Sequence, residues 1–402
     1  MKHICLLILL FNCFLGNCFA DDWTVNTVAY NMTGLSSVAV DINNNPIVSF
    51  TTIPYPAYSA LYAVTQTDSG YDVNQIRTGA AWPKIIVNSN NELTIAFQTL
   101  GGNVWYGTKS SWFDWFFSQV ASTAPVACPD IALTSNDIPH LAYIGGSGYV
   151  EHAFYNIQTQ QWVKETLTGF GNYSIGNLDI DIDSSGRILI GCHDRGGTLR
   201  CAVSTNGSWY YLPVMQTSDA DSGFAAGDLP AVAYIKSEML YYAVYISEIG
   251  WVETQIGIAR TTGHKRYSLA HSSTGIPGIA YSDNGILMYA TNIAGGWTTV
   301  PVDQYGKYID LIFDRSDNPL ISYAGFDDCL AVPVIKLAGI GLESFNIADL
   351  NNDKIVNFSD FAIMAEYWMM TLPAPDRALG DLTENAVVDV RDLRYFGCYW
   401  LN

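Results

Sequence analysis

Pro-Gly-Ile-Ala-Tyr, residues 277–281, is one copy of a short motif that recurs along the chain and decides its fold. Each copy closes an apolar segment with a small residue and, in all copies but one, an aromatic residue. The copies end at Ser49-Phe50, Ala96-Phe97, Ala142-Tyr143, Gly191-Cys192, Ala233-Tyr234, Ala280-Tyr281 and Ser322-Tyr323. Successive copies lie 42 to 49 residues apart, close to the roughly 40–45 residues of a β-propeller blade. The spacing therefore predicts seven blades.

Each repeat has room for four strands. In the sixth repeat we expect them at 267–270, 277–281, 287–291 and 297–302. Turns rich in Asn, Asp, Ser and Gly precede most motifs, and these residues tolerate the positive φ angles of tight turns. An aromatic residue opens the fourth strand of most repeats: Tyr71, Trp112, Trp162, Trp209, Trp251 and Trp297. An open β-solenoid is the alternative, but four strands in more than 40 residues favour a propeller.

The last repeat, residues 308–335, has three strands and lacks a fourth. The missing pattern occurs at the other end of the chain, in Trp23-Thr24-Val25-Asn26-Thr27-Val28. We therefore expect the N-terminal strand to complete the last blade, which would leave no open edge to promote aggregation. The predicted fold is an all-β propeller over residues 21–341, followed by a small helical unit over residues 342–402.

The composition and the N-terminus bear on location and partners. The 402 residues carry 19 Lys plus Arg against 38 Asp plus Glu, a formal net charge of -19, which argues against a nucleic-acid partner.

Lys2 and His3 precede an apolar run over residues 4–15 and then Cys18-Phe19-Ala20, the pattern of a signal peptide. The run is too short to span a bilayer. We expect residues 1–20 to be removed after Ala20, giving a secreted or cell-surface protein with no transmembrane segment.

Two cysteines occupy positions that hold aromatic residues in most other repeats. Cys192 and Cys201 are symmetric about Gly196-Gly197, so a hairpin turning there would set them opposite each other, within reach of a disulfide. A secreted chain permits the oxidation. We predict this disulfide, with two buried thiols as the alternative. The same alignment places His152 in an aromatic position, which favours a core histidine over a ligand or base.

After Leu342 the pattern changes to a loop and a helix, twice. Calcium prefers six to eight oxygen ligands, and both loops supply oxygens at loop positions 1, 3, 5, 7, 9 and 12. In the first loop these are Asp349, Asn351, Asp353, the carbonyl of Ile355, Asn357 and Asp360; in the second they are Asp381, Thr383, Asn385, the carbonyl of Val387, Asp389 and Asp392. Helices are expected at 361–368 and 393–400. We predict one or two calcium ions, the first loop binding better because Thr383 and Asn385 are neutral. Lys354 and Ala386 replace the Gly common at position 6, so a helical hairpin without metal is the alternative.

The duplicated loop resembles a type I dockerin. The resemblance implies calcium-dependent folding and docking onto a cohesin-like partner, with Phe358, Ser359, Val390 and Arg391 at the docking positions. The blades resemble those of secreted bacterial propellers grouped loosely with sialidase-type folds. Sialidase chemistry needs an arginine clamp, but Arg187 and Arg315 fall on the opposite turns, and no Ser-x-Asp-x-Gly-x-x-Trp box occurs.

One face of the propeller, the loop face, carries the fourth-to-first and second-to-third connections. On it the sequence places Tyr55, Tyr58, His193, Asp194, Arg195, Lys236, Glu238, Asp283, Asp327 and Asp328. Aromatic and carboxylate side chains suit sugar recognition, although solvated loops look similar. We predict a binding or scaffold module for a polysaccharide or cell-surface ligand, tethered through its C-terminal unit. A glycoside hydrolase, a lyase with His193 and Tyr55 as its acid–base pair, or a purely structural protein remains an alternative. The sequence leaves open whether the protein is an enzyme.

Overall fold

The computed structural model describes most of the chain after the N-terminal segment. The described residues are 23–52, 59–67, 70–99, 101–110, 114–122, 128–171, 175–194, 197–205, 207–217, 222–227, 229–260, 267–293, 295–328, 331–345, 348–351, 356–369, 381–382 and 387–400. The predicted signal peptide therefore lies outside them. So do several predicted site residues: Tyr55, Tyr58, Arg195, Asp353, Ile355, Thr383 and Asn385.

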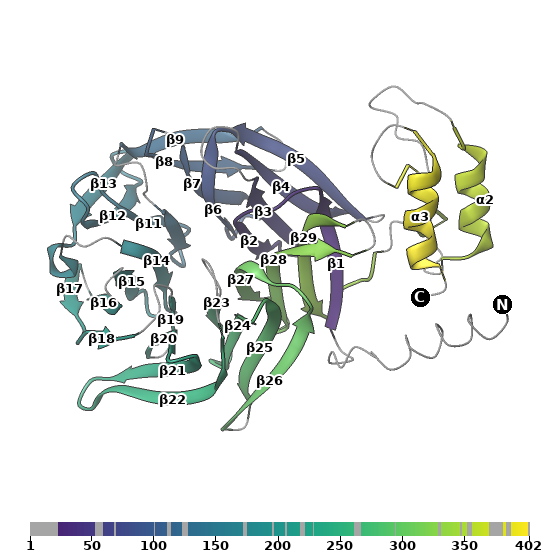
Figure 1. The fold of residues 1–402 in the computed structure, drawn as a ribbon. Helices are drawn as coiled ribbons and strands as arrows, with labels where there is room; N and C mark the ends of the chain where they lie inside the picture. The colour runs from purple at the N-terminus through teal and green to yellow at the C-terminus, as the bar shows by residue number, and fades with distance from the viewer. Residues whose placement is uncertain are drawn as a thin grey trace.

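Seven antiparallel sheets form a ring, which confirms the predicted propeller (Figure 1). Blades 1 to 3 are β2–β5 (Ser36–Val40, Pro46–Thr51, Ala60–Thr67, Gly70–Thr78), β6–β9 (Ala80–Val87, Leu93–Thr99, Asn103–Lys109, Phe116–Ser122) and β10–β13 (Asp130–Leu133, Pro139–Ile144, Val150–Asn156, Gln161–Thr166). A 3-10 turn, η1 (Thr168–Phe170), follows blade 3. Blade 4 is β14–β17 (Ile175–Ile182, Ile188–Asp194, Thr198–Thr205, Ser208–Tyr211) with the short β18 (Met215–Gln216) paired to β16. Blades 5 and 6 are β19–β22 (Ser222–Ala226, Pro230–Lys236, Met239–Ile246, Gly250–Ile258) and β23–β26 (Tyr267–His271, Pro277–Asp283, Ile286–Ile293, Gly296–Asp303).

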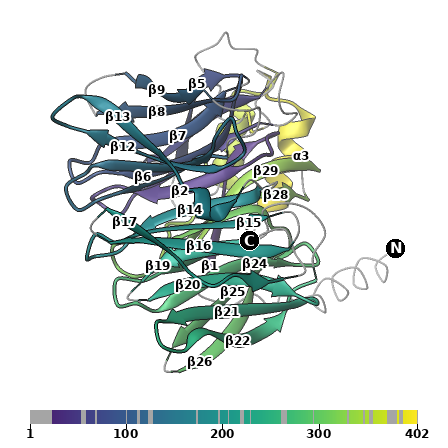
Figure 2. The ribbon, with the colours of Figure 1, turned by 90° about the vertical axis from the view of Figure 1, so that its left-hand side faces the viewer.

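The seventh blade closes the ring as predicted. It combines β27 (Lys307–Phe313), β28 (Pro319–Asp327) and β29 (Val332–Ile340) with β1 (Trp23–Tyr30), which pairs antiparallel with β29. The ladder runs from Trp23 opposite Ile340 to Tyr30 opposite Val334. Consequently β1 is the outermost strand of the blade, and the first strands of successive blades contact one another around the axis (Figure 1). Figure 2 shows the same sheets from the side.

Edge-to-face and tilted aromatic contacts between blades explain why a tryptophan opens so many fourth strands. Four such rings pack on a third-strand residue of the preceding blade: Trp162 on Tyr106 at 5.2 Å between ring centroids, Trp209 on His152 at 5.3 Å, Trp297 on Tyr242 at 5.1 Å and Trp23 on Tyr289 at 5.2 Å. These contacts lie between sheets, where buried aromatic area contributes most to stability. The tryptophans therefore join neighbouring blades.

A repeated turn links the blades on the face opposite the loop face. In six blades the first turn residue accepts backbone N–H groups two or four residues on; these residues are Asp41, Asn88, Thr134, Asp183, Ser272 and Asp314. The fourth turn residue has positive φ and is Asn, Asp or Gly. Where it is Asn or Asp, its oxygen accepts an N–H from the preceding blade, as Asp317 does from Ser273 at 2.7 Å and Asn91 from Ile42 at 2.9 Å. Gly186 and Gly275 have no side chain to make this link.

The predicted disulfide between Cys192 and Cys201 is wrong. Neither residue forms a disulfide in the described part of the chain. The β15–β16 ladder pairs Gly191 with Cys201 and Cys192 with Arg200, so the real register is offset by one residue. Because successive side chains of a strand point to opposite faces, Cys192 packs with Leu178 between blades 3 and 4, whereas Cys201 packs with Phe224 between blades 4 and 5.

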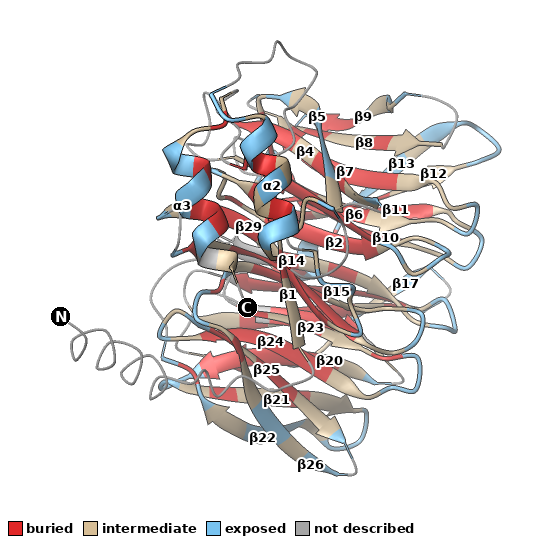
Figure 3. Ribbon diagram, turned by 90° about the vertical axis from the view of Figure 1, so that its right-hand side faces the viewer, coloured by how far each residue is buried: buried red, intermediate tan, exposed pale blue. Residues whose placement is uncertain are grey.

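Two antiparallel helices follow the propeller, α2 (Phe358–Glu366) and α3 (Val390–Tyr399), beside β1 and β29 (Figures 1 and 3). Both begin three residues earlier than the apolar pattern suggests. Asn357 and Asp389 act as N-caps, each in a reciprocal capping box with Asp360 or Asp392. Such boxes satisfy the first N–H groups of a helix. Ala348, Met364, Leu382 and Phe396 form part of a small apolar core.

Candidate functional site

The predicted ligand residues are spread along the loop face, one blade after another. His193 and Asp194 end β15, Lys236 ends β20, Asp283 ends β24 and Asp327 ends β28. These strands belong to blades 4, 5, 6 and 7. The structure therefore places these described residues on one face but does not gather them into a single cluster.

Two of these residues do not face solvent. The His193 side chain is fully buried, and its Nε2 lies 3.0 Å from Thr217 Oγ1. Asp327 is also buried and accepts a hydrogen bond from the Tyr399 hydroxyl of α3 at 3.3 Å. Neither position gives a ligand access. An acid–base role for His193 has no geometric support, because the catalytic group must reach the substrate.

Asp283 instead forms one half of an exposed ion pair. Its carboxylate accepts hydrogen bonds from the Arg260 amide at 2.8 Å and from the guanidinium Nη2 at 3.0 Å. Burial would raise the pKa of Asp283, but the hydrogen bonds and charge of Arg260 outweigh it, so that pKa is lowered. Asp283 remains a carboxylate, and the arginine side chain is 57% exposed. The pair thus presents both donors and acceptors to solvent.

A second polar pair lies one blade further on. Tyr305, which is 38% exposed, donates its hydroxyl to Asp328 Oδ1 at 3.1 Å and packs its ring 5.7 Å from that of Phe326. Backbone hydrogen bonds join this stretch to the first pair: Gly306 donates to Gly285 at 2.8 Å, and Asn284 donates to the Arg260 carbonyl at 2.7 Å. We call Arg260, Asp283, Tyr305, Phe326 and Asp328 the blade 5–7 rim.

Three rim residues, Arg260, Tyr305 and Phe326, were not among the predicted site residues. One signal could have found two of them: Arg260 lies two residues after the end of β22, and Tyr305 lies two residues after the end of β26. Each then meets the second-to-third-strand hairpin of the next blade. The partner positions depend on how the blades are juxtaposed, which strand patterns alone do not specify.

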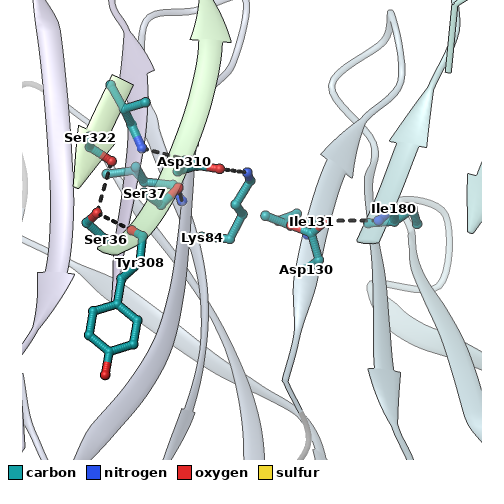
Figure 4. Close-up of polar contacts among 11 residues, drawn as sticks. Ser36, Ser37, Lys84, Asp130, Ile131, Ile180, Tyr308, Asp310 and Ser322 are labelled. Atoms are coloured by element: carbon teal, nitrogen blue, oxygen red, sulfur yellow. Dashed lines mark hydrogen bonds and ion pairs between the residues drawn. The ribbon is translucent and has the colours of Figure 1, made fainter. Parts of the chain in front are cut away.

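A polar ring surrounds the propeller axis. The small residue of each motif pairs across the ladder with one residue of the innermost strand, and those seven residues form the axial ring: Ser37, Lys84, Asp130, Asp179, Gly223, Ser268 and Asp310. Figure 4 shows part of this ring. Equivalent positions thus carry three carboxylates and one lysine.

The axial ring ties neighbouring blades together. Lys84 Nζ lies 2.8 Å from Asp310 Oδ1, and the other Asp310 oxygen accepts the Val38 amide at 3.0 Å. Asp130 similarly accepts the Ile180 amide of the next blade at 2.9 Å. Burial disfavours the charged ammonium, but Asp310 in particular outweighs this effect, so the pKa of Lys84 is raised. The ring therefore contributes chiefly to closure of the propeller.

A buried histidine pair lies between blades 3 and 4. His140 Nδ1 lies 2.9 Å from His152 Nε2, and His152 Nδ1 lies 2.8 Å from Glu165 Oε1. Trp209 also donates to this carboxylate at 2.9 Å. Burial, together with His152, lowers the pKa of His140 to about 4, and burial lowers that of His152 against the opposing effect of Glu165. His152 occupies an aromatic packing position, as predicted, with Glu165 satisfying its polar edge.

The C-terminal loops bring buried carboxylates to equivalent positions. Asp360 and Asp392 are both fully buried, and Asp381 is 6% exposed. Asp360 accepts the amides of Leu350 at 2.7 Å, Asn351 at 3.1 Å and Asn357 at 2.8 Å. Asp389 pairs with Arg391 at 2.7 Å. No group of three or more His, Cys, Asp or Glu side chains is placed to hold a metal within the described ranges, which omit Asp353, Thr383 and Asn385.

Comparison with known proteins identifies the fold class. No protein-family model and no curated protein match the chain. Among solved structures it is similar to the SapL1 lectin in complex with α-methyl fucoside, with 10% identity and a TM-score of 0.50 over 68% of this chain and 97% of the lectin. It is also similar to AofleA from Arthrobotrys oligospora, with 11% identity and a TM-score of 0.50 over 70% and 89% of the chains. At such low identities the similarity supports the propeller fold alone.

In the described chain, no helix has the length and apolar character needed to cross a membrane.

Proposed function

We propose that this protein is a secreted carbohydrate-binding propeller whose ligand site is the blade 5–7 rim. The observation that carries the proposal is the exposed Tyr305 ring beside two polar pairs, Arg260–Asp283 and Tyr305–Asp328. Aromatic rings pack on the apolar faces of sugars, while carboxylates and guanidinium groups hydrogen-bond their hydroxyls. The rim offers both kinds of contact on one face.

The structural similarity to a fucoside-bound lectin supports the choice of the first ligand to test. The full chain would be screened on a glycan array and titrated with α-methyl fucoside by calorimetry. Tyr305→Ala and Asp283→Asn are expected to weaken binding at least tenfold. Tyr210→Ala is the matched control, because Tyr210 is 61% exposed on β17 of blade 4. Equal affinities for all variants would reject the rim as the binding site.

The same array distinguishes binding from catalysis. Bound glycans are incubated with the protein, and released reducing ends or unsaturated products are measured. Binding without products supports a binding module. Product formation that Asp283→Asn abolishes would instead favour a polysaccharide-degrading enzyme with its site on this rim.

We further propose that the C-terminal unit binds calcium and docks onto a cohesin-like partner. The donors are Asp349, Asn351, Asp353, the Ile355 carbonyl, Asn357 and Asp360, with the equivalent residues of the second loop. The equivalent placement of buried carboxylates in the two loops, Asp360 and Asp392, supports the proposal, because carboxylate oxygens are the ligands that calcium, a hard cation, prefers. Calorimetric titration of the full chain with calcium should show heat, reduced by Asp349→Ala; no heat in the wild type would reject the site.

Exposed apolar residues support the docking proposal. Phe358 is 76% exposed and Val390 is 68% exposed, each at the first turn of its helix. Large apolar side chains exposed at equivalent positions favour a protein contact. Phe358→Ala with Val390→Ala is expected to abolish capture of a cohesin domain, whereas Tyr210→Ala should not affect it.

Secretion is tested separately, by N-terminal sequencing of the protein recovered from culture medium. The sequence read should begin at Asp21 if the signal peptide is cleaved as expected.

A further inference from the structure

The C-terminal helices pack directly on the strand that closes the propeller. Tyr30, the last residue of β1, packs edge-to-face on Tyr395 of α3, with ring centroids 5.8 Å apart, and the two hydroxyls are hydrogen-bonded. Tyr30 also lies against the apolar core of the helical unit, which includes Met364 and Val388. The end of the closing strand is therefore part of the helical unit's core.

A second contact comes from the next turn of α3. The Tyr399 hydroxyl donates to Asp327 Oδ2 at 3.3 Å, and its ring lies 5.0 Å from that of Tyr395. Asp327 ends β28, two strands away from β1 in the same blade. The helix α3 thus holds two strands of blade 7 at once.

The connecting segment covers the middle of β1. Asn26, which is 1% exposed, donates its side-chain amide to the Glu343 carbonyl at 2.8 Å, and its side-chain oxygen accepts the Phe345 amide at 3.1 Å. Phe345 packs edge-to-face on Tyr71 of blade 1, with ring centroids 5.4 Å apart. Both hydrogen-bonding groups of a buried amide are satisfied by the same short segment, which is the mark of a fixed interface.

We propose that the C-terminal helical unit is an intramolecular clamp that holds the propeller closed. The strand β1 is outermost in blade 7 and is hydrogen-bonded in its sheet to β29 only. Terminal strands fray unless they are tied down, and a helix laid over an edge strand is one way to protect it. The contacts of Tyr30, Asn26 and Asp327 supply that protection.

The clamp leaves the outward surface of α3 available. At 100° per residue, Tyr399 projects from the side of the helix opposite to Val390, and Tyr395 lies about 140° from Val390 around the helix axis. The exposed Val390 therefore faces away from the propeller. A partner could dock there without breaking the clamp, because the clamp contacts are made by Tyr395, Tyr399 and the connecting segment and not by Val390.

Hydrogen exchange followed by mass spectrometry tests the clamp in the full chain. Tyr395→Ala with Tyr399→Ala is expected to speed amide exchange about tenfold in residues 23–30, because an aromatic pair and two hydrogen bonds are lost. Residues 130–166 of blade 3 should be unchanged. Phe358→Ala, on the exposed surface of the same unit, is the matched control and should leave residues 23–30 unchanged.

The milder variants Tyr399→Phe and Asp327→Asn keep the test decisive if the double variant does not fold. Each should speed exchange in residues 23–30 about threefold while α3 remains protected. Unchanged exchange in β1, with faster exchange confined to the helices, would overturn the clamp. Repeating the measurement with a calcium chelator separates the two proposals, since loss of calcium alone should act first on residues 348–400.

Discussion

Replacing Lys84 by Met would test how the axial ring stabilises the propeller. Lys84 is the one cation of that ring, and its ammonium lies 2.8 Å from the Asp310 carboxylate, whose side chain is 2% exposed. Removing one partner of a buried ion pair costs roughly 3–5 kcal/mol, because the other charge stays buried. The Lys84 side chain is 23% exposed, which admits water, so we expect a loss of about 3 kcal/mol.

The assay is urea unfolding at pH 7, with the free energy of unfolding taken from the transition. Lys307→Met is the control, because Lys307 is an exposed lysine of β27 and should change stability by less than about 0.5 kcal/mol. Adding Asp310→Asn to Lys84→Met should restore stability, since it removes the buried charge left behind. The reasoning fails if the double variant recovers nothing, or if Lys84→Met costs no more than the control.

Three further predictions follow from the buried histidines, the turns and the cysteines. Because burial lowers the folded-state pKa values of His140 and His152 from 6.5, the stability that the neutral pair contributes is fully present above about pH 6.5 and is lost as the pH falls toward the folded-state values, about 4 for His140. Lowering the pH from 7 to 4.5 should therefore reduce the free energy of unfolding more in the wild type than in His152→Phe, and equal reductions in the two proteins would contradict this. Gly186→Asn should stabilise the protein by up to ~1 kcal/mol in urea unfolding, because Asn tolerates the φ of 81° at this turn and could accept the Ser135 amide of the preceding blade. Burial raises the pKa of the Cys201 thiol, so we expect slow labelling by thiol reagents until the protein unfolds and no disulfide in non-reducing mass mapping.

The number of blades and the ring closure could be predicted because they depend on periodicity alone. The motif spacing gave seven sheets, and the unmatched strand at Trp23 fitted the one blade that lacked a strand. Proline also marked where second strands begin: β24 starts at Pro277 and β28 at Pro319. The residue is a reliable marker because proline can occupy only the ladder positions that need no N–H.

The exact register could not be predicted from symmetry about a turn. Centring the hairpin on Gly196-Gly197 placed Cys192 opposite Cys201, whereas the ladder pairs Cys201 with Gly191. A shift of one residue moves a side chain to the other face of the sheet. The same offset separates Tyr281 from Tyr289, which faces Ala280.

The candidate sites were harder to predict because their residues come from different blades. Asp283 and Asp328 were identified from their loops, but Arg260 and Tyr305 acquire their roles only when neighbouring blades meet. The axial ring is hidden for another reason: its seven equivalent positions carry Ser, Lys, Asp and Gly side chains without a repeated residue type. Only the ladder register shows that they are equivalent.

Pairing of β1 with β29 also constrains how the chain reaches its folded state during synthesis. Trp23 and Ile340 face each other across that ladder although 317 residues separate them. The strand β1 must therefore wait unpaired until nearly the whole propeller has been made. Contacts so distant along a chain form slowly and leave strand edges open to other molecules in the meantime. Newly made copies should consequently depend on chaperones until their last blade is translated.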